Sequence, residues 1–418
     1  MSRRPQSEEP IRLKNGASRQ NPLTSLGIGS ATQNSGCSHR YNQIRVTRLP
    51  LPFPNAEARG TGTGNRKRFL VTAKLQFAGP MRYRVRSAGA FCRSGLGTCV
   101  RRLLKGPRRP GWNWTVELVT RALQVQLAQA FALPDVAAMR RYLDAVVIHS
   151  AALSRVDTIP DTHRQFSGSW FVPRQAAPRG TLLYFHGGGY SFYPKAHADL
   201  IALITLAVKT RTFALDYRLS PEHQFPAQLE DALGAYRWLL ERGIAADDVV
   251  IGGDSAGANL TLALLLAVRD LKLPSPALAF ALSPPTDFNP PEVRGSLNEF
   301  EADLDWISWP MLVKWADWFC LPEQRRDPLV SPIHADLRDL PPVYIQAGGA
   351  EILYPSIAAF ADRAQGQGAN VILETWADMN HNFQMFGYRA PQSAQALHRL
   401  GEVIDSRLRQ LATADEHR

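Results

Sequence analysis

Short apolar runs alternate with longer amphipathic stretches through the second half of the chain. The short runs predict buried strands at 182–185, 212–216, 249–252, 278–282, 343–346 and 371–375. Apolar residues at helical spacing predict helices between them, at 200–209, 228–242, 256–271 and 352–364. Alternating strands and helices indicate an α/β fold with a mostly parallel sheet flanked by helices on both faces. Active sites in such sheets lie at the carboxyl ends of the strands.

Two further helices are predicted ahead of the first strand. Apolar residues recur at helical spacing over 118–131, Pro134 interrupts the pattern, and a second apolar stripe runs over 136–150. Because these helices precede the sheet, we expect them to lie over its active-site edge as a helical cap.

Residues 1–110 differ from the rest of the chain in charge. They carry 22 Lys and Arg against 3 Asp and Glu, a net charge of +19, whereas the remaining residues carry 26 basic and 34 acidic groups, a net charge of −8. We expect a basic, disordered N-terminal extension over 1–110, cap helices over 111–165 and the main α/β domain over 166–413. The extension also has the composition of a targeting segment or of a start-site artefact.

Composition argues against several classes of protein. No run approaches the ~18 consecutive apolar residues of a membrane-spanning helix. The four cysteines include no C-x-x-C pair, so no metal site or redox site is indicated. The basic extension carries no zinc spacing or RNA-binding signature, so we do not expect nucleic acid as a partner. The main domain has one cysteine and therefore no internal disulfide, which fits a cytoplasmic protein.

The stretch Gly253-Asp254-Ser255-Ala256-Gly257 joins a predicted strand to a predicted helix. Glycine on both sides of the serine permits a sharp turn that lifts the hydroxyl clear of the backbone. The start of the following helix favours developing negative charge. Ser255 is therefore the candidate nucleophile.

A glycine-rich loop, His186-Gly187-Gly188-Gly189, directly follows the first strand of the main domain. The N–H groups of these three glycines, together with that of Ala256, are candidates for an oxyanion hole, where each donor is typically worth ~3 kcal/mol in the transition state. A plain glycine turn is the alternative. We expect His186 to brace this loop rather than to act as a base.

A serine hydroxyl needs a base, and neutral imidazole serves near pH 7. His381 follows the last predicted strand, so it is the candidate base, with a buried structural histidine as the alternative. Glu351 follows the strand at 343–346 and is the candidate acid that orients the imidazole. An ordinary glutamate at a helix start is the alternative, and Asp378 is then the fallback.

These motifs together resemble those of the hormone-sensitive-lipase-like family of α/β-hydrolases. The resemblance covers roughly 112–411 and includes the HGGG loop, the stretch from Asp216 to Ala227 and the segment GDSAGAN at 253–259. It implies a serine carboxylesterase or lipase acting on short to medium acyl esters without a cofactor. It also implies oxyanion N–H groups at Gly188 and Gly189, and a second part of the cap near 288–325. The stretch from Asp216 to Ala227 would be a structural brace.

The chain departs from the family pattern at several positions. Glu351-Ile352-Leu353 stands where much of the family has an aspartate motif, and Tyr354-Pro355 follows where acidic residues are common in the glutamate-using subgroup. The segment 190–193 (YSFY) is bulky where small residues are frequent, which favours a narrow pocket. Four tryptophans at 306, 309, 315 and 318 would either line an acyl site or pack the cap on the core.

The expected partner is a small-molecule ester, without metal, and a homodimer remains open. Three alternatives stand beside the esterase hypothesis. The same triad would serve a lactone or amide hydrolase. A ligand-binding member of the fold would have lost catalysis. A third hypothesis assigns the function to the basic extension, with the main domain as a platform.

Overall fold

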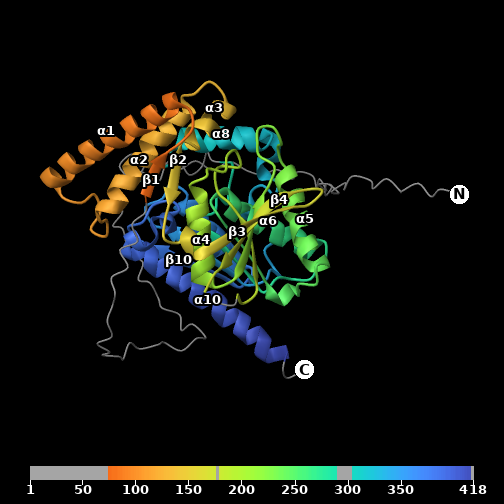
Figure 1. The fold of residues 1–418 in the computed structure, drawn as a ribbon. Helices are drawn as coiled ribbons and strands as arrows, with labels where there is room; N and C mark the ends of the chain where they lie inside the picture. The colour runs from red at the N-terminus through yellow and green to blue at the C-terminus, as the bar shows by residue number, and fades with distance from the viewer. Residues whose placement is uncertain (1–73, 176–177, 290–303, 416–418) are drawn as a thin grey trace, which may run out of the picture. The chain divides into compact units, whose positions relative to one another are not determined.

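The six predicted strands form the parallel part of one eight-stranded sheet in the computed structural model (Figure 1). The structure describes residues 74–175, 178–289 and 304–415, all within the compact unit 68–418. The strand order is β10-β9-β8-β7-β5-β6-β4-β3. Its parallel members are β5 (Thr181–Phe185), β6 (Arg211–Asp216), β7 (Val249–Asp254), β8 (Leu278–Leu282), β9 (Val343–Gly348) and β10 (Val371–Trp376). The predicted α/β fold is confirmed.

Two antiparallel strands extend one edge of the sheet and were not predicted. They are β3 (Val156–Thr162) and β4 (Ser167–Pro173), which pair with each other, and β4 also pairs with β6. Most of β3 is exposed, and Pro160 lies within it. An edge strand of this kind has no continuous apolar run, so its sequence lacks the pattern of a buried strand.

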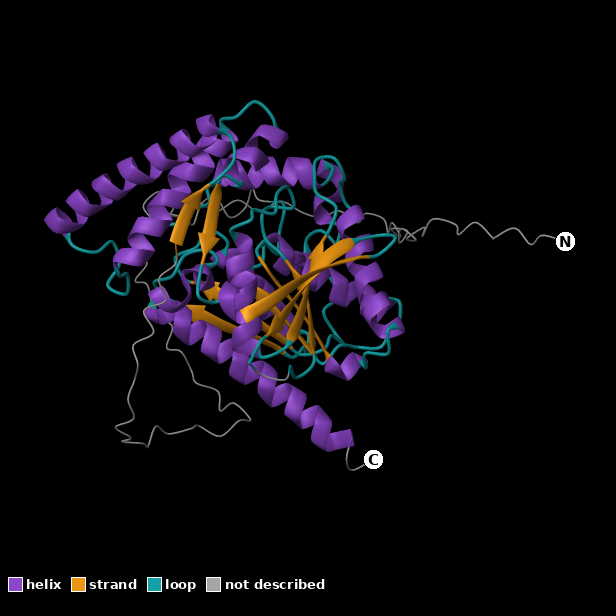
Figure 2. Cartoon of the chain, in the orientation of Figure 1, coloured by secondary structure: helices purple, strands orange, loops and turns teal. Residues whose placement is uncertain are grey.

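Helices cover both faces of the sheet, as Figure 2 shows. The core on one face is formed mainly by α5 (Ala227–Glu241), α6 (Ala256–Asp270) and α9 (Tyr354–Gly366). The core on the other face is formed by α4 (His197–Val208) and α10 (Pro391–Asp415). α6 is buried along nearly its whole length, which explains its almost uninterrupted apolar sequence.

The cap consists of segments from two distant parts of the chain. Its first part contains α1 (Met81–Lys105), α2 (Trp114–Phe131) and α3 (Val136–Leu143), and its second part contains α8 (Trp309–Phe319). Ring contacts join the two parts, with the centroid of Phe131 on α2 lying 5.2 Å from that of Trp315 on α8. The start of α2 is set by Asn113, whose side chain accepts a hydrogen bond from the Val116 N–H at 3.0 Å. The predicted helical cap is present (Figure 1).

The prediction of one helix over 136–150 is wrong in its second half. α3 ends at Leu143, and β2 (Val146–His149) pairs antiparallel with β1 (Lys74–Phe77). The apolar run from Val146 to Ile148 satisfies a helical and a strand pattern equally, and only the distant partner strand decides between them.

The prediction of a disordered extension over the whole of 1–110 is also wrong, because β1 and α1 lie inside that range. Apart from Tyr83, the buried residues of α1 are small or polar, which conceals the helix from an apolar-periodicity analysis: Ser87, Ala90, Ser94 and Thr98. The rest of that prediction, over 1–73, lies outside the described residues. None of the helices in the described ranges is long and apolar enough to span a bilayer.

Candidate active site

Ser255 lies on a sharp turn between β7 and α6, as its sequence context predicts. Its backbone has φ 51° and ψ −120°, and its N–H donates to the carbonyl oxygen of Leu282 at 2.8 Å. The turn requires glycine at 257, since a Cβ there would lie 2.0 Å from the carbonyl oxygen of Phe185. The strained backbone therefore holds the serine hydroxyl at the carboxyl edge of the sheet.

The three predicted triad side chains lie within hydrogen-bond distance of one another. Nε2 of His381 is 2.9 Å from Oγ of Ser255, and Nδ1 of His381 is 3.1 Å from Oε2 of Glu351. They follow β7, β9 and β10, so the parallel sheet brings together residues that are far apart in sequence. In this arrangement Nε2 is placed to receive the serine proton, and the carboxylate is placed to accept a hydrogen bond from Nδ1–H.

The imidazole lies in a buried, negatively charged setting. His381 and Glu351 are both buried. Burial by itself lowers the pKa of His381, but the hydrogen bond and charge of Glu351, and then the charge of Asp305, outweigh it and raise the pKa above its usual value. The carboxylates thus stabilise the imidazolium that proton transfer from serine would create.

Three of the four predicted oxyanion donors have free N–H groups in the described part of the chain. Among the residues that the structure describes, the N–H groups of Gly188, Gly189 and Ala256 have no hydrogen-bond acceptor. The assignment of Gly187 is wrong, because its N–H donates to Oδ1 of Asp254 at 2.9 Å. A chain-reversing loop at Gly188, with φ 113°, directs the donors that remain.

His186 braces the glycine loop, as expected. Its ring stacks between those of Tyr193 and Tyr217, with centroids 3.8 Å and 4.2 Å away, and its Nδ1 lies 2.7 Å from the Gly187 carbonyl oxygen. Burial lowers the pKa of His186 to about 3, so the ring is neutral at physiological pH. A neutral, stacked imidazole holds the loop in place and takes no part in proton transfer with the serine.

Asp254 connects the three segments of the site, a role that sequence reasoning missed. Its fully buried carboxylate accepts hydrogen bonds from the hydroxyl of Tyr184 at 2.5 Å, the Gly187 N–H at 2.9 Å and the Asn382 amide at 2.7 Å. Nε2 of His197 lies 2.9 Å away. Burial by itself raises the pKa of Asp254, but the charge and hydrogen bond of His197 lower it below its usual value. The glycine loop, the serine turn and the histidine loop are therefore held by one ionised group.

Asp305 is a second buried carboxylate that sequence reasoning missed. Its oxygens accept from the N–H groups of Trp306 at 2.7 Å, Ile352 at 2.9 Å and His381 at 3.3 Å. Its own carbonyl oxygen accepts from the side chain of Gln124 on α2 at 2.7 Å. Burial raises the pKa of Asp305 to about 6. The cap, the acid loop and the histidine loop meet at this residue.

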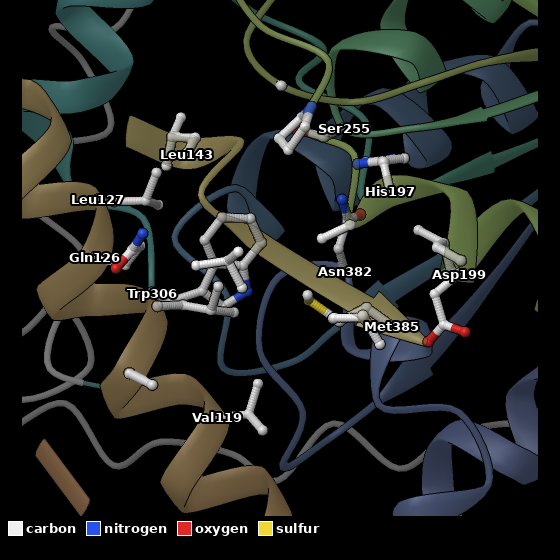
Figure 3. A pocket seen from close by; sticks show the side chains of 18 of the residues that line it. Val119, Gln126, Leu127, Leu143, His197, Asp199, Ser255, Trp306, Asn382 and Met385 are labelled. Atoms are coloured by element: carbon white, nitrogen blue, oxygen red, sulfur yellow. The ribbon is translucent and has the colours of Figure 1, made fainter. Parts of the chain in front are cut away.

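An apolar cavity of about 320 Å³ opens onto Ser255 (Figure 3). Its lining comes from the cap and from the edge of the sheet, and Figure 3 shows Leu127 and Leu143 of the cap to the left of Ser255 and Val119 below it. Leu75 on β1 and Phe91 on α1 also line it. A closed apolar wall with few polar groups is typical of a site for the hydrocarbon part of a ligand.

The bulky residues after the glycine loop narrow this cavity less than expected. Of residues 190–193, only Phe192 lines the cavity, whereas Tyr190 stacks on Phe319 with centroids 3.9 Å apart and Tyr193 stacks on His186. The tryptophans divide between the two predicted roles. Trp306 and Trp315 line the cavity, and Trp318 stacks on Phe131 within the cap.

Comparisons with known proteins agree with this architecture. Residues 182–385 match a family model described as an alpha/beta hydrolase fold. The chain is 36% identical over 239 residues to an acetyl-hydrolase of Streptomyces hygroscopicus, covering 57% of this chain and 79% of that protein. It is 30% identical over 237 residues to an esterase of Acinetobacter venetianus, covering 56% of this chain and 78% of that protein.

A solved structure of an esterase from the bacterial hormone-sensitive lipase family superposes with a TM-score of 0.64 at 30% sequence identity. The superposition covers 71% of this chain and 99% of that one. Sequence, sheet order and site geometry thus lead to one assignment. The chain belongs to the hormone-sensitive-lipase-like family of α/β-hydrolases.

Proposed function

We propose that the chain is a carboxylic ester hydrolase with Ser255 as nucleophile, His381 as base and Glu351 as the acid that orients the imidazole. The observation that carries the proposal is the pair of distances at His381, 2.9 Å to the serine oxygen and 3.1 Å to the carboxylate. The esterases and the acetyl-hydrolase to which the chain is similar act as hydrolases of this class.

The acylation step begins with attack of the serine oxygen on the ester carbonyl carbon. His381 Nε2 takes the hydroxyl proton, and the carbonyl oxygen becomes an oxyanion that accepts hydrogen bonds from the N–H groups of Gly188, Gly189 and Ala256. The tetrahedral species then collapses, the bond to the alcohol oxygen breaks, and the imidazolium gives its proton to the departing alkoxide. The products of this half-reaction are an alcohol and an acyl-serine.

The deacylation step repeats the sequence with water. His381 takes a proton from the water, which attacks the acyl carbon, and the same N–H groups bind the second oxyanion. Collapse releases the carboxylic acid, and the proton on the imidazole returns to the serine oxygen. Glu351 accepts a hydrogen bond from Nδ1–H throughout and is not itself protonated, so Nε2 is unprotonated at the start of each step.

The cavity supports short to medium acyl groups as substrates. Its volume of about 320 Å³ lies at the small end of the usual range for ligand pockets. The lining is mainly apolar, and its charged side chains already pair with one another, Arg389 with Asp199 and His197 with Asp254, so it favours an uncharged acyl chain.

A panel of p-nitrophenyl esters of increasing acyl length tests the proposal. We expect hydrolysis that declines for the longest chains, and Ser255→Ala should lose nearly all turnover. Glu351→Gln should lose about 10³- to 10⁴-fold in kcat, because an amide holds the imidazole in the wrong tautomer. Full activity of Glu351→Gln would remove the glutamate from the mechanism.

Lactones and anilides assayed beside the esters distinguish the remaining hydrolase alternatives. A kcat/KM for a lactone or an anilide above that for every ester would assign the triad to that substrate. Ester turnover that depends on Ser255 would exclude a purely ligand-binding protein, and turnover retained after removal of residues 1–73 would exclude the platform hypothesis.

The proposal also includes a cytoplasmic location and a homodimeric state for the chain. Three cysteines in the described part of the chain, Cys92, Cys99 and Cys320, are free thiols, which fits a reducing compartment. Light scattering of the purified chain measures the oligomeric state directly.

A further inference from the structure

The outer face of α1 is apolar although it is exposed. Six large hydrophobic side chains on this helix are between 49% and 78% exposed: Met81, Val85, Leu96, Val100, Leu103 and Leu104. Elsewhere in the described residues, large exposed hydrophobics are scattered, whereas here they gather on one helix of 25 residues. A gathered apolar surface of this kind marks a site of interaction.

The exposed hydrophobic residues lie on one side of the helix. At 100° per residue, Met81, Val85, Leu96 and Leu103 fall within about 60° of one another, and Val100 and Leu104 extend this stripe by about a further 80°. The opposite side of α1 packs on α2 and α3 through small and polar side chains, among them Ser87, Ala90 and Ser94. The helix is therefore reversed with respect to an ordinary surface helix, with its more apolar face directed away from the protein.

Basic residues flank the stripe, and no acidic residue lies on the helix. Three of them, Arg82, Arg84 and Arg93, are exposed and form no ion pair within the described part of the chain. Glu117 on α2 is the acidic side chain that faces α1, and it is already paired with Arg101 and Arg102. The stripe and its borders thus carry an uncompensated positive charge.

We propose that this face of α1 docks the enzyme onto the surface of an anionic phospholipid bilayer. An exposed apolar stripe with flanking Arg side chains matches the chemistry of such a surface, where side chains such as Leu96 enter the acyl boundary and the cations meet the lipid phosphates. α1 is the outermost helix of the cap, with α2 between it and the main domain (Figure 1). It can therefore lie in the plane of a bilayer without displacing another of the described helices or strands.

The docking face and the substrate cavity share one helix. Phe91 of α1, with Leu75 of β1, lines the cavity that opens onto Ser255. A chain docked by α1 would hold one wall of its cavity against the bilayer. Esters dissolved in the lipid could then enter the cavity directly from the bilayer. This last step rests on the proposed function, whereas the docking itself does not.

Sedimentation with vesicles tests the docking. The full chain is mixed with vesicles of phosphatidylcholine alone, or with about one third phosphatidylglycerol, and the bound fraction is measured. We expect binding at least about tenfold tighter to the anionic vesicles, weakening as salt rises. Leu96→Gln with Leu103→Gln should weaken that binding about tenfold or more, from the apolar surface that is removed. Arg82→Gln with Arg84→Gln and Arg93→Gln should abolish most of the preference for anionic lipid.

A matched control replaces two exposed leucines elsewhere, Leu271→Gln with Leu321→Gln, and should leave vesicle binding unchanged. All variants should hydrolyse soluble p-nitrophenyl acetate at the wild-type rate, which shows that they are folded and separates the docking from the esterase proposal. Vesicle binding that survives Leu96→Gln with Leu103→Gln would overturn the proposal. So would a wild-type dimer that this double variant converts to a monomer without loss of vesicle binding, since the stripe would then be an interface between two copies.

Discussion

Replacing Asp305 by asparagine removes one negative charge from the junction of the cap, the acid loop and the histidine loop while keeping the shape of the side chain. The carboxylate accepts from three backbone N–H groups, those of Trp306, Ile352 and His381. An amide has one acceptor oxygen, so at least one of these N–H groups loses its partner. Hydrogen bonds to charged groups are worth about 1.5–3 kcal/mol each, which sets the destabilisation that the lost acceptor causes.

A second effect of Asp305→Asn opposes the first. Burial raises the pKa of Asp305 from 3.8 to about 6, so keeping the group ionised at pH 7.5 costs the folded state about 3 kcal/mol. The native state binds the proton more tightly than the unfolded chain, so the free energy of unfolding falls as pH rises from about 4 to about 6. The neutral amide carries no such cost, and the two effects of the substitution nearly cancel at pH 7.5.

We therefore expect Asp305→Asn to fold and to change catalysis instead. The charge of Asp305 helps to raise the pKa of His381, so its removal should shift the acidic limb of the kcat/KM profile to lower pH. Urea denaturation measures the free energy of unfolding at pH 4.5 and at pH 7.5. Between these two pH values it should fall less for the variant than for the wild type. An unchanged acidic limb together with an unchanged pH dependence of unfolding would refute the assignment of a charged, positioning role to Asp305.

Three further changes test other parts of the structure. Gly188→Ala should lose at least about 10²-fold in kcat, since a Cβ there would lie 2.0 Å from the Phe192 carbonyl oxygen and displace the oxyanion donors; steady-state kinetics measures this. Arg140→Ala should lower the free energy of unfolding, measured by urea titration, by about 2–4 kcal/mol. The Arg140 guanidinium on α3 donates to Glu222 and to the carbonyl oxygens of Ser191 and Ser220 in the main domain. Phe91→Trp should fill part of the cavity and shift the ester preference to shorter chains, as an acyl-length panel would record.

The results that count against these three predictions differ in kind. A wild-type kcat in a Gly188→Ala protein with a normal melting temperature would contradict the first prediction. An unchanged denaturation midpoint for Arg140→Ala would count against the second, and Arg140→Lys serves as the control that keeps the charge but loses the bidentate contact with Glu222. A Phe91→Trp variant whose dependence of ester turnover on acyl length equals that of the wild type would contradict the third prediction.

Local sequence patterns predicted the residues whose positions depend on their neighbours in the chain. The turn at Ser255 needs only a strand, flanking glycines and a helix, and these are adjacent in sequence. The placement of His381 and Glu351 followed from parallel strands whose carboxyl ends meet at one edge.

Residues that act through distant partners could not be predicted in this way. Asp254 lies inside the recognised serine motif, yet its role depends on Tyr184, Gly187 and Asn382, which come from three other segments. The N–H of Gly187 was assigned to the oxyanion hole because nothing in the sequence shows that this carboxylate occupies it. Asp305 has no motif at all, and its contacts are visible only once the cap and both loops are in place.

The order of the site along the chain has a consequence for biosynthesis. Ser255 leaves the ribosome more than a hundred residues before His381, which follows the last strand at the sheet edge. A nascent or truncated polypeptide that ends before β10 contains the hydroxyl without its base, and is therefore inert toward the esters it meets during synthesis. Hydrolytic competence arrives only after residue 381 has been made, when the last strand can join the sheet and place the imidazole beside the serine.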